Sequence, residues 1–151
     1  MTGLKSEEII NAIRARLYQI APDTTVYKTS QTRPVYPHFF VHQIGATDDE
    51  KRKNHHLLTF SFDIRYRIAS DPSTDLKTDQ KLDEMALKLF VGFTVIDCND
   101  IKIRCGNKNY EKVDGVLHFF FDVKTQVLLV NMNENIPKQQ KLGVEIGVKN
   151  G

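Results

Sequence analysis

The stretch HLLTFSFDIRYRI, from His56 to Ile68, alternates apolar and polar residues over almost its whole length. The even positions from Leu58 to Ile68 are all apolar, and the odd positions from Thr59 to Arg67 are all polar. Because side chains on a strand point alternately to its two faces, this pattern predicts one long strand, buried on one face and polar on the other. At about 3.3 Å per residue it would span roughly 40 Å, well beyond a typical strand. Such a strand either crosses the whole sheet or extends past its own core toward a partner, which favours a structural or interaction protein.

Two amphipathic helices are predicted, one before the long strand and one after it. The first runs from about Glu7 to Ile20, behind a hydroxyl cap at Ser6, with apolar residues at helical spacing. The second runs from about Asp75 to Val91, and Gly92 is placed to end it. Their apolar stripes are expected to cover the sheet.

Further strands are expected at residues 24–28, 38–44, 101–105, 110–113 and 116–130. The charged segment Gly45–Asn54 is predicted to be a solvated hairpin loop, and GNKN at residues 106–109 is predicted to be a turn. Asp114-Gly115 supplies the positive φ angles of a two-residue hairpin turn. The strand that follows is apolar on one face and partly apolar on the other. We therefore expect a helix or a neighbouring subunit to cover part of that other face.

The order of elements is therefore α-β-β-β-α-β-β-β, which predicts an α+β fold. We expect a largely antiparallel mixed sheet with long strands and with two helices packed on one face. Residues 1–130 are expected to form a single domain. Residues 131–151 are polar and contain three glycines, so we expect an extended C-terminal tail that orders by adding a strand to the sheet of a partner.

The composition indicates a soluble globular protein. A net charge of +2 over 151 residues is too small to indicate a nucleic-acid-binding or membrane-binding protein by itself. The longest apolar runs are too short to cross a bilayer, and acidic residues stand where the apolar core of a signal peptide would begin. Cys98 and Cys105, the two cysteines, are expected to be free and reduced.

No catalytic, cofactor-binding or metal-binding residues are predicted. His38 and His42 share a strand face but would lie about 13 Å apart, too far to bind one metal ion. The sequence has no glycine-rich phosphate loop and no nucleophile motif. Asp97 and Asp100 flank Cys98, and nearby negative charge would raise the pKa of its thiol and make it a poor nucleophile.

Basic residues on two predicted strands could form one stripe. The alternative, which we favour from the sequence, is a solvated sheet face with local ion pairs, for instance to Asp63 or Asp122. The candidate interface or lumen residues are Asp63, Arg65, Arg67, Lys102 and Arg104.

Two stretches taken together resemble a known family. FSFDIRY at residues 60–66 is followed, after the second helix, by YEKVDGVLHFFFDV at residues 110–123. Their order resembles the tail terminator family of contractile phage tails, defective-prophage particles and R-type bacteriocins, over roughly Glu7 to Val130. The resemblance implies a small α+β protein without catalytic residues or cofactors. It implies a hexameric ring at the head-proximal end of the tail tube that stops tube growth, engages the last sheath ring and joins the tail to the neck or collar.

The partners implied by the resemblance are five further copies of the chain, the tail tube protein, the tail sheath protein and a neck or head-completion protein. The protein would be assembled in the cytoplasm of the bacterial host and located in the virion or phage-like particle. Non-specific DNA is a further expected partner in the lumen, through the charged segment Asp48–Lys53 or the basic residues above. Two alternatives remain: another neck or tail completion protein of similar fold, and a small ligand-binding or enzymatic α+β domain.

Overall fold

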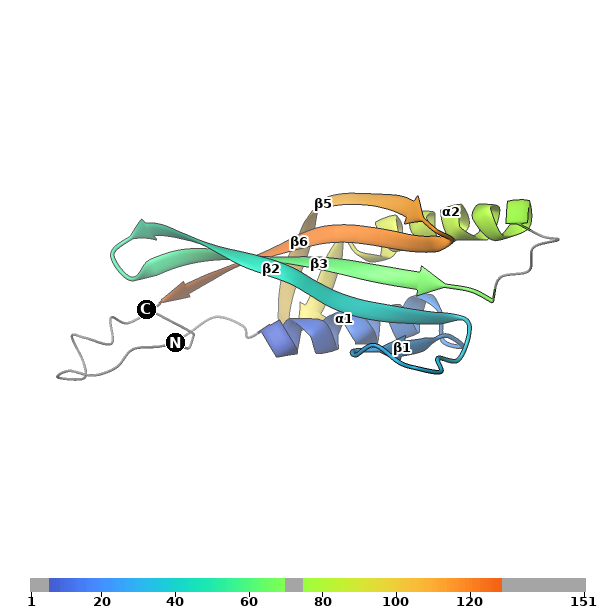
Figure 1. Ribbon diagram of the computed structural model, residues 1–151. Helices are drawn as coiled ribbons and strands as arrows, with labels where there is room; N and C mark the ends of the chain where they lie inside the picture. The colour runs from blue at the N-terminus through green and yellow to red at the C-terminus, as the bar shows by residue number, and fades with distance from the viewer. Residues whose placement is uncertain (1–5, 70–74, 129–151) are drawn as a thin grey trace.

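The structure is a computed structural model that describes residues 6–69 and 75–128 (Figure 1). The helices are α1 (Ser6–Ile20) and α2 (Asp75–Gly92). The strands are β1 (Thr25–Tyr27), β2 (His38–Arg52), β3 (His55–Arg67), β4 (Val95–Cys98), β5 (Ile101–Val113) and β6 (Val116–Leu128). They form one six-stranded sheet in the order β1-β2-β3-β6-β5-β4, with a parallel β1–β2 pair and antiparallel pairs elsewhere.

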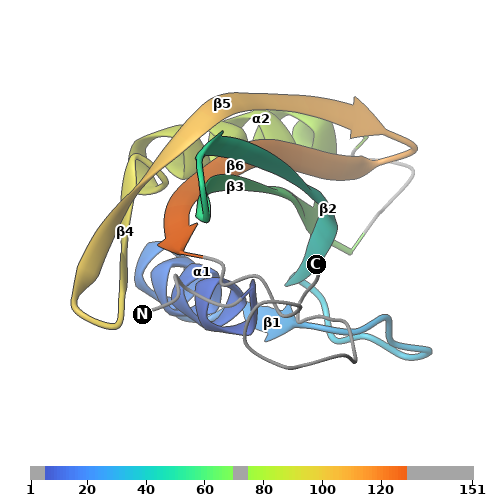
Figure 2. The same ribbon diagram turned by 90° about the vertical axis from the view of Figure 1, so that its left-hand side faces the viewer.

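The core lies between the two helices and one face of the sheet. Strand β3 contributes Phe60, Phe62, Ile64 and Tyr66 to this core, which are the alternate positions that its sequence predicts. Helix α1 contributes Ile9, Ile13 and Leu17, and helix α2 contributes Leu82, Met85, Ala86 and Leu89. The sheet curls around α1, as Figure 2 shows. The predicted α+β class, with two helices on one face of a largely antiparallel sheet, is confirmed.

The second strand is much longer than predicted. Residues 45–52, expected to be a loop, continue β2 to Arg52, and only Lys53 and Asn54 connect it to β3. Asn54 has a φ of 64°, which a tight hairpin connection requires. The prediction failed because every residue of this segment is exposed, and a strand that is polar on both faces has the composition of a loop. Its backbone groups are paired by β3, a relationship that composition cannot reveal.

The predicted turn at residues 106–109 is also wrong. Ile101 to Val113 form one strand, β5, and its register against β6 shifts between Gly106 and Asn109. Asn107 has a φ of 51° at this shift. The polar GNKN segment is therefore a β-bulge, in which one extra residue bends the strand without ending it.

One short strand was missed and one turn was predicted correctly. Strand β4 pairs with the start of β5 through a turn at Asn99 and Asp100, whose φ angles are 50° and 65°. The Asp114-Gly115 turn between β5 and β6 has φ angles of 52° and 77°, so this prediction is confirmed.

The predicted tail at residues 131–151, and with it the predicted domain boundary at residue 130, lies outside the described residues. Within the described residues, no helix has the length and apolar character needed to cross a membrane.

Candidate interaction surfaces

The face of the sheet opposite the helices, here called the outer face, carries an ordered set of polar and aromatic side chains. The strand register aligns them in rows: Phe40, Arg65 and His118 in one row, then His42, Asp63 and Phe120 in the next, then Gly45, Ser61 and Asp122. Each row crosses β2, β3 and β6. Three of the sequence-predicted candidates, Asp63, Arg65 and Arg67, lie on this face.

Asp63 is the most unusual residue of the outer face, because it is only 3% exposed although neither α1 nor α2 covers it. Its Oδ2 atom accepts hydrogen bonds from Arg65 Nε and from the His118 ring at Nδ1, each at 3.0 Å. These charge-assisted contacts offset the cost of removing the carboxylate from water. Its Oδ1 atom is buried and has no hydrogen-bond partner among the described residues. Asp63 therefore retains one buried acceptor atom that no group in the described part of the chain satisfies.

The two arginines of β3 are held against aromatic rings. The Arg65 guanidinium carbon lies 5.5 Å from the centre of the Phe40 ring, and that of Arg67 lies 5.9 Å from the Tyr36 ring. Such cation–π contacts orient the side chains along the sheet. His38 lies beside Tyr36, and its burial lowers the pKa of the imidazole, with a smaller lowering effect from Arg67.

A hydrogen-bonded row crosses the outer face at the level of Ser61. The Ser61 hydroxyl donates to Asp122 Oδ1 at 2.8 Å, and the Asn107 side chain donates to Asp122 Oδ2 at 2.8 Å. This row connects β3, β6 and the bulge of β5. The sequence predicts His118 and Asp122 on the polar face of their strand, but neither the contact of His118 with Asp63 nor that of Asn107 with Asp122 was expected, since only the strand register brings these residues together.

The four basic candidates do not form one stripe. Arg65 on β3 lies opposite His118 on β6, and His118 lies opposite Glu111 on β5. Lys102 lies on β5 on the other side of the bulge, opposite Asp97 on β4. Lys102 Nζ lies 2.7 Å from Asp97 Oδ1. The favoured alternative of local ion pairs is confirmed for Arg65 with Asp63, and Lys102 pairs with an acid that was not anticipated. Around the three rows, the charged side chains of the outer face are Asp63, Glu111 and Asp122 together with Arg65, Arg67 and Lys124, so this part of the face has no excess of positive charge. Lys102 and Arg104 add positive charge at its β4–β5 end, where Asp97 pairs with Lys102.

The second candidate surface is the projecting part of the β2–β3 hairpin, residues 45–57, here called the arm. Figure 1 shows it extending well beyond both helices. All of its residues from Gly45 to Lys53 are exposed, and β2 and β3 remain paired out to Arg52 and His55. The arm is therefore an ordered projection and not a loop.

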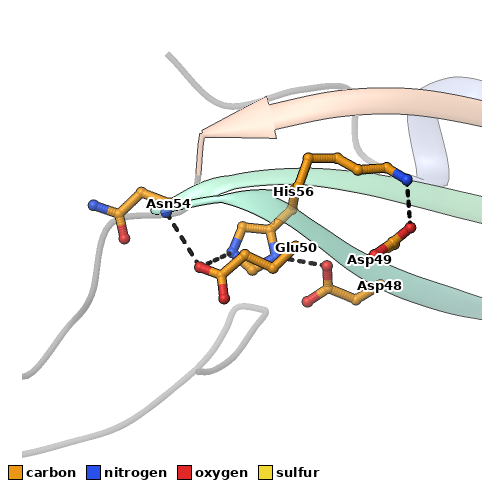
Figure 3. A network of polar contacts seen from close by, with 6 residues as sticks. Asp48, Asp49, Glu50, Asn54 and His56 are labelled. Atoms are coloured by element: carbon orange, nitrogen blue, oxygen red, sulfur yellow. Dashed lines mark hydrogen bonds and ion pairs between the residues drawn. The ribbon is translucent and has the colours of Figure 1, made fainter.

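A polar network stabilises the tip of the arm (Figure 3). His56 lies between two carboxylates, with 2.6 Å from its Nδ1 to Asp48 Oδ1 and 3.5 Å from its Nε2 to Glu50 Oε2. Glu50 also accepts a hydrogen bond from the backbone N–H of Asn54 at 3.2 Å. The network joins β2, the turn and β3, and it holds the charged tip in a defined conformation.

Both cysteines are free, as expected from the sequence, and both are buried. Burial raises the pKa of the Cys105 thiol to about 11. The pKa of the Cys98 thiol is also raised, chiefly by burial and then by Glu8. The predicted rise in the pKa of Cys98 is therefore correct, but the main cause of the rise is burial and not the neighbouring aspartates. In the described part of the chain, no group of three or more His, Cys, Asp or Glu residues is arranged to hold a metal ion.

Comparison with known protein families decides where this fold belongs. The model of the family described as "Phage tail terminator protein" matches residues 8–135. The chain belongs to the phage tail terminator family. The family resemblance found in the sequence is confirmed, and the chain is a structural protein of the phage tail, located in the tail of the virion.

The other comparisons add little to this family assignment. No curated protein matches the chain. Eighteen chains of solved structures match it. One of them covers 85% of this tail terminator and 99% of its own length, at 16% identity and a TM-score of 0.37. That similarity is too low to support a conclusion about fold or function. The arm and the outer face are accordingly interpreted as surfaces of a tail protein.

Proposed function

We propose that this tail terminator assembles as a sixfold ring on the head-proximal end of the tail tube. There it stops tube growth and joins the tail to the neck or collar. In a contractile particle the ring also engages the last sheath ring. The family match supports the location in the tail. The proposal of a ring with specific contacts rests on the ordered arm, whose residues 45–53 are all exposed.

The arm has the features of a protein contact surface. An isolated two-stranded hairpin is marginal in water, because ordering its backbone costs more than its own contacts return. Here the arm continues the central strands of the sheet, and His56 ties its tip to Asp48 and Glu50. None of its β2 residues contributes to the core. The ordered conformation of the arm is therefore best explained by contact with a partner. In a ring, the arm reaches the neighbouring subunit or the tube end.

The outer face is proposed as the second contact surface. Arg65 and Arg67 are pre-oriented by aromatic rings, and the buried Asp63 also holds Arg65 in place. Since acidic and basic side chains balance on this face, it suits a protein partner better than DNA phosphates, which require an excess of positive charge. Lys102 and Arg104 would make a separate contact, because they lie at the β4–β5 end of the sheet.

The test is assembly of the purified protein with and without tail tube protein, measured by light scattering and negative-stain imaging. We expect hexameric rings with a central hole, which form more readily on tube ends. A strict monomer under both conditions contradicts the proposal.

A shortened arm tests the observation on which the proposal rests. In this variant a two-residue Asn-Gly turn replaces residues 49–57, so that Asp48 and Leu58, which lie opposite each other on β2 and β3, remain paired. Its far-UV circular dichroism and unfolding transition should remain those of a folded domain, and its ring formation or attachment to the tube should be lost. The matched control is Lys88→Gln, which removes an exposed charge on helix α2, outside both proposed contact surfaces. Normal assembly of the shortened variant would show that the arm is not a contact surface.

A further inference from the structure

The sheet has two backbone edges that nothing in the described chain covers. Strand β1 pairs only with residues 38–40 of β2, so residues 41–52 of β2 pair with β3 alone. Strand β4 pairs only with residues 101–104 of β5, so residues 106–113 of β5 pair with β6 alone. Unpaired strand edges are ready templates for another chain and are usually short or covered. We refer to these segments as the β2 edge and the β5 edge.

The directions of the two edges suit each other. Strands β2, β3, β6 and β5 are successively antiparallel, so β5 runs opposite to β2 at the far side of the sheet. If neighbouring subunits are related by rotation about an axis near the strand direction, each copy keeps its strand directions. The β5 edge of one copy then meets the β2 edge of the next as an antiparallel pair, and the contact is head-to-tail, the kind that closes into a ring.

The two edges also have matching spacing. Between the rows of Ser61 and Asp63, the inner strands advance by two residues, from 61 to 63 on β3 and from 122 to 120 on β6. Over the same interval the β2 edge advances by three residues, from Gly45 to His42, because of its bulge. The β5 edge also advances by three, from Gly106 to Asn109. Each edge thus carries one extra residue at the same level of the sheet, so the two edges fit each other in register.

A glycine lies on each edge, and both belong to the row of Ser61 and Asp122. Neither Gly45 nor Gly106 has a positive φ angle, and a Cβ atom added to either would meet nothing within 4 Å. Gly115 differs, because its φ of 77° requires glycine. The chain's own fold therefore does not explain Gly45 or Gly106. Glycine inside a strand often marks a place where another backbone approaches closely.

We propose that the β2 edge of one subunit pairs with the β5 edge of the next, antiparallel, with Gly45 opposite Gly106 and His42 opposite Asn109. The sheet then continues from subunit to subunit around the ring. In this register residues 41–45 of the β2 edge pair with residues 106–110 of the β5 edge. A second copy of this chain thus accounts for both bulges and both glycines with one contact, whereas a foreign strand would account for one edge only. This inference rests on the proposed ring and specifies its interface.

Disulfide trapping tests the register. The variant carries His42→Cys and Asn109→Cys, both at exposed positions of the outer face. Directly opposite residues of paired strands have Cα atoms about 4.5–5.5 Å apart, within the roughly 4.4–6.8 Å that a disulfide allows. Within one chain the two positions are three strand spacings apart, about 14 Å, so they cannot form an intramolecular bond. Mild oxidation should give a covalent ladder up to the hexamer on a non-reducing gel, which a reductant collapses.

The matched control is His42→Cys with Val113→Cys, which moves the second cysteine along β5 by four residues, about 13 Å. It should form the ring without the ladder. If light scattering shows a ring but the His42–Asn109 pair gives no ladder, or gives no more than the control, the inferred interface is wrong and the ring stands. If no oligomer forms with or without tube protein, both the ring and this interface are wrong.

Discussion

Asp63 and His118 are hydrogen-bonded across β3 and β6, with 3.0 Å between Asp63 Oδ2 and His118 Nδ1. The two residues are 55 positions apart in the sequence and lie on the face of the sheet that no helix covers. Arg65 completes the group from the same strand. A buried carboxylate that accepts hydrogen bonds from Arg65 and His118 organises the centre of the outer face.

Asp63→Asn should destabilise the fold. Asparagine keeps the shape of the side chain but removes the charge that Arg65 and His118 share, and hydrogen bonds to charged groups contribute about 1.5–3 kcal/mol each. We expect the free energy of unfolding to fall by about that amount, measured by urea unfolding. Asp97→Asn, which affects only the exposed pair with Lys102, serves as the control and should leave the urea midpoint unchanged. An unchanged midpoint for Asp63→Asn would refute a stabilising role for the group.

Acidification should destabilise the fold through His38. Burial holds the pKa of this imidazole below its ordinary value of 6.5, so the unfolded chain takes up a proton at a higher pH than the folded chain does. The contribution of His38 is complete above pH 6.5 and is lost as the pH falls through the lowered folded pKa. We expect the free energy of unfolding to decrease from about pH 7 downward, and His38→Gln to reduce this slope. The exposed His42→Gln is the control. Identical slopes for the parent and His38→Gln would contradict the prediction.

Both thiols should be unreactive in the folded protein. Burial raises the pKa of the Cys105 thiol to about 11, and the pKa of Cys98 is raised by the same cause. Because the thiolate is the reactive form, an aromatic disulfide reagent at pH 8 should label neither residue. In denaturant, two thiols per chain should react at the rate of free cysteine. Fast labelling of either residue under native conditions would mean that its surroundings open readily.

Gly45→Ala should leave the isolated domain as stable as the parent or make it slightly more stable. The position has ordinary backbone angles and open space for a Cβ atom, so alanine mainly restricts the unfolded chain, an effect of about 0.4–1 kcal/mol. Gly115→Ala is the contrasting control and should lower the free energy of unfolding, since its φ is 77°. Thermal unfolding of the unassembled protein measures both. A strongly destabilised Gly45→Ala would mean that the fold itself needs this glycine.

Local pattern was sufficient to predict the parts of the fold that alternate between core and solvent. The alternation of apolar residues predicted the long strand β3, and helical spacing with end signals predicted both helices. The residue types of Asp114-Gly115 predicted the turn between β5 and β6. The family resemblance was also found from two short stretches of these core strands. In each case the information lies within a few neighbouring residues, because a helix or strand that buries one face must repeat its apolar residues at a fixed period.

The arm, the bulges and the outer face were decided by tertiary structure alone. Residues 45–52 and 106–109 have loop composition, and they are strands because β3 and β6 pair with their backbones. Likewise, Asp63 meets His118, and Gly45 shares a row with Gly106, only through the register of strands that are far apart in the sequence. That register is set by the packing of the opposite face against α1 and α2. A one-residue slip would turn every core side chain of a strand toward solvent, so the core determines which polar residues face one another on the outer face.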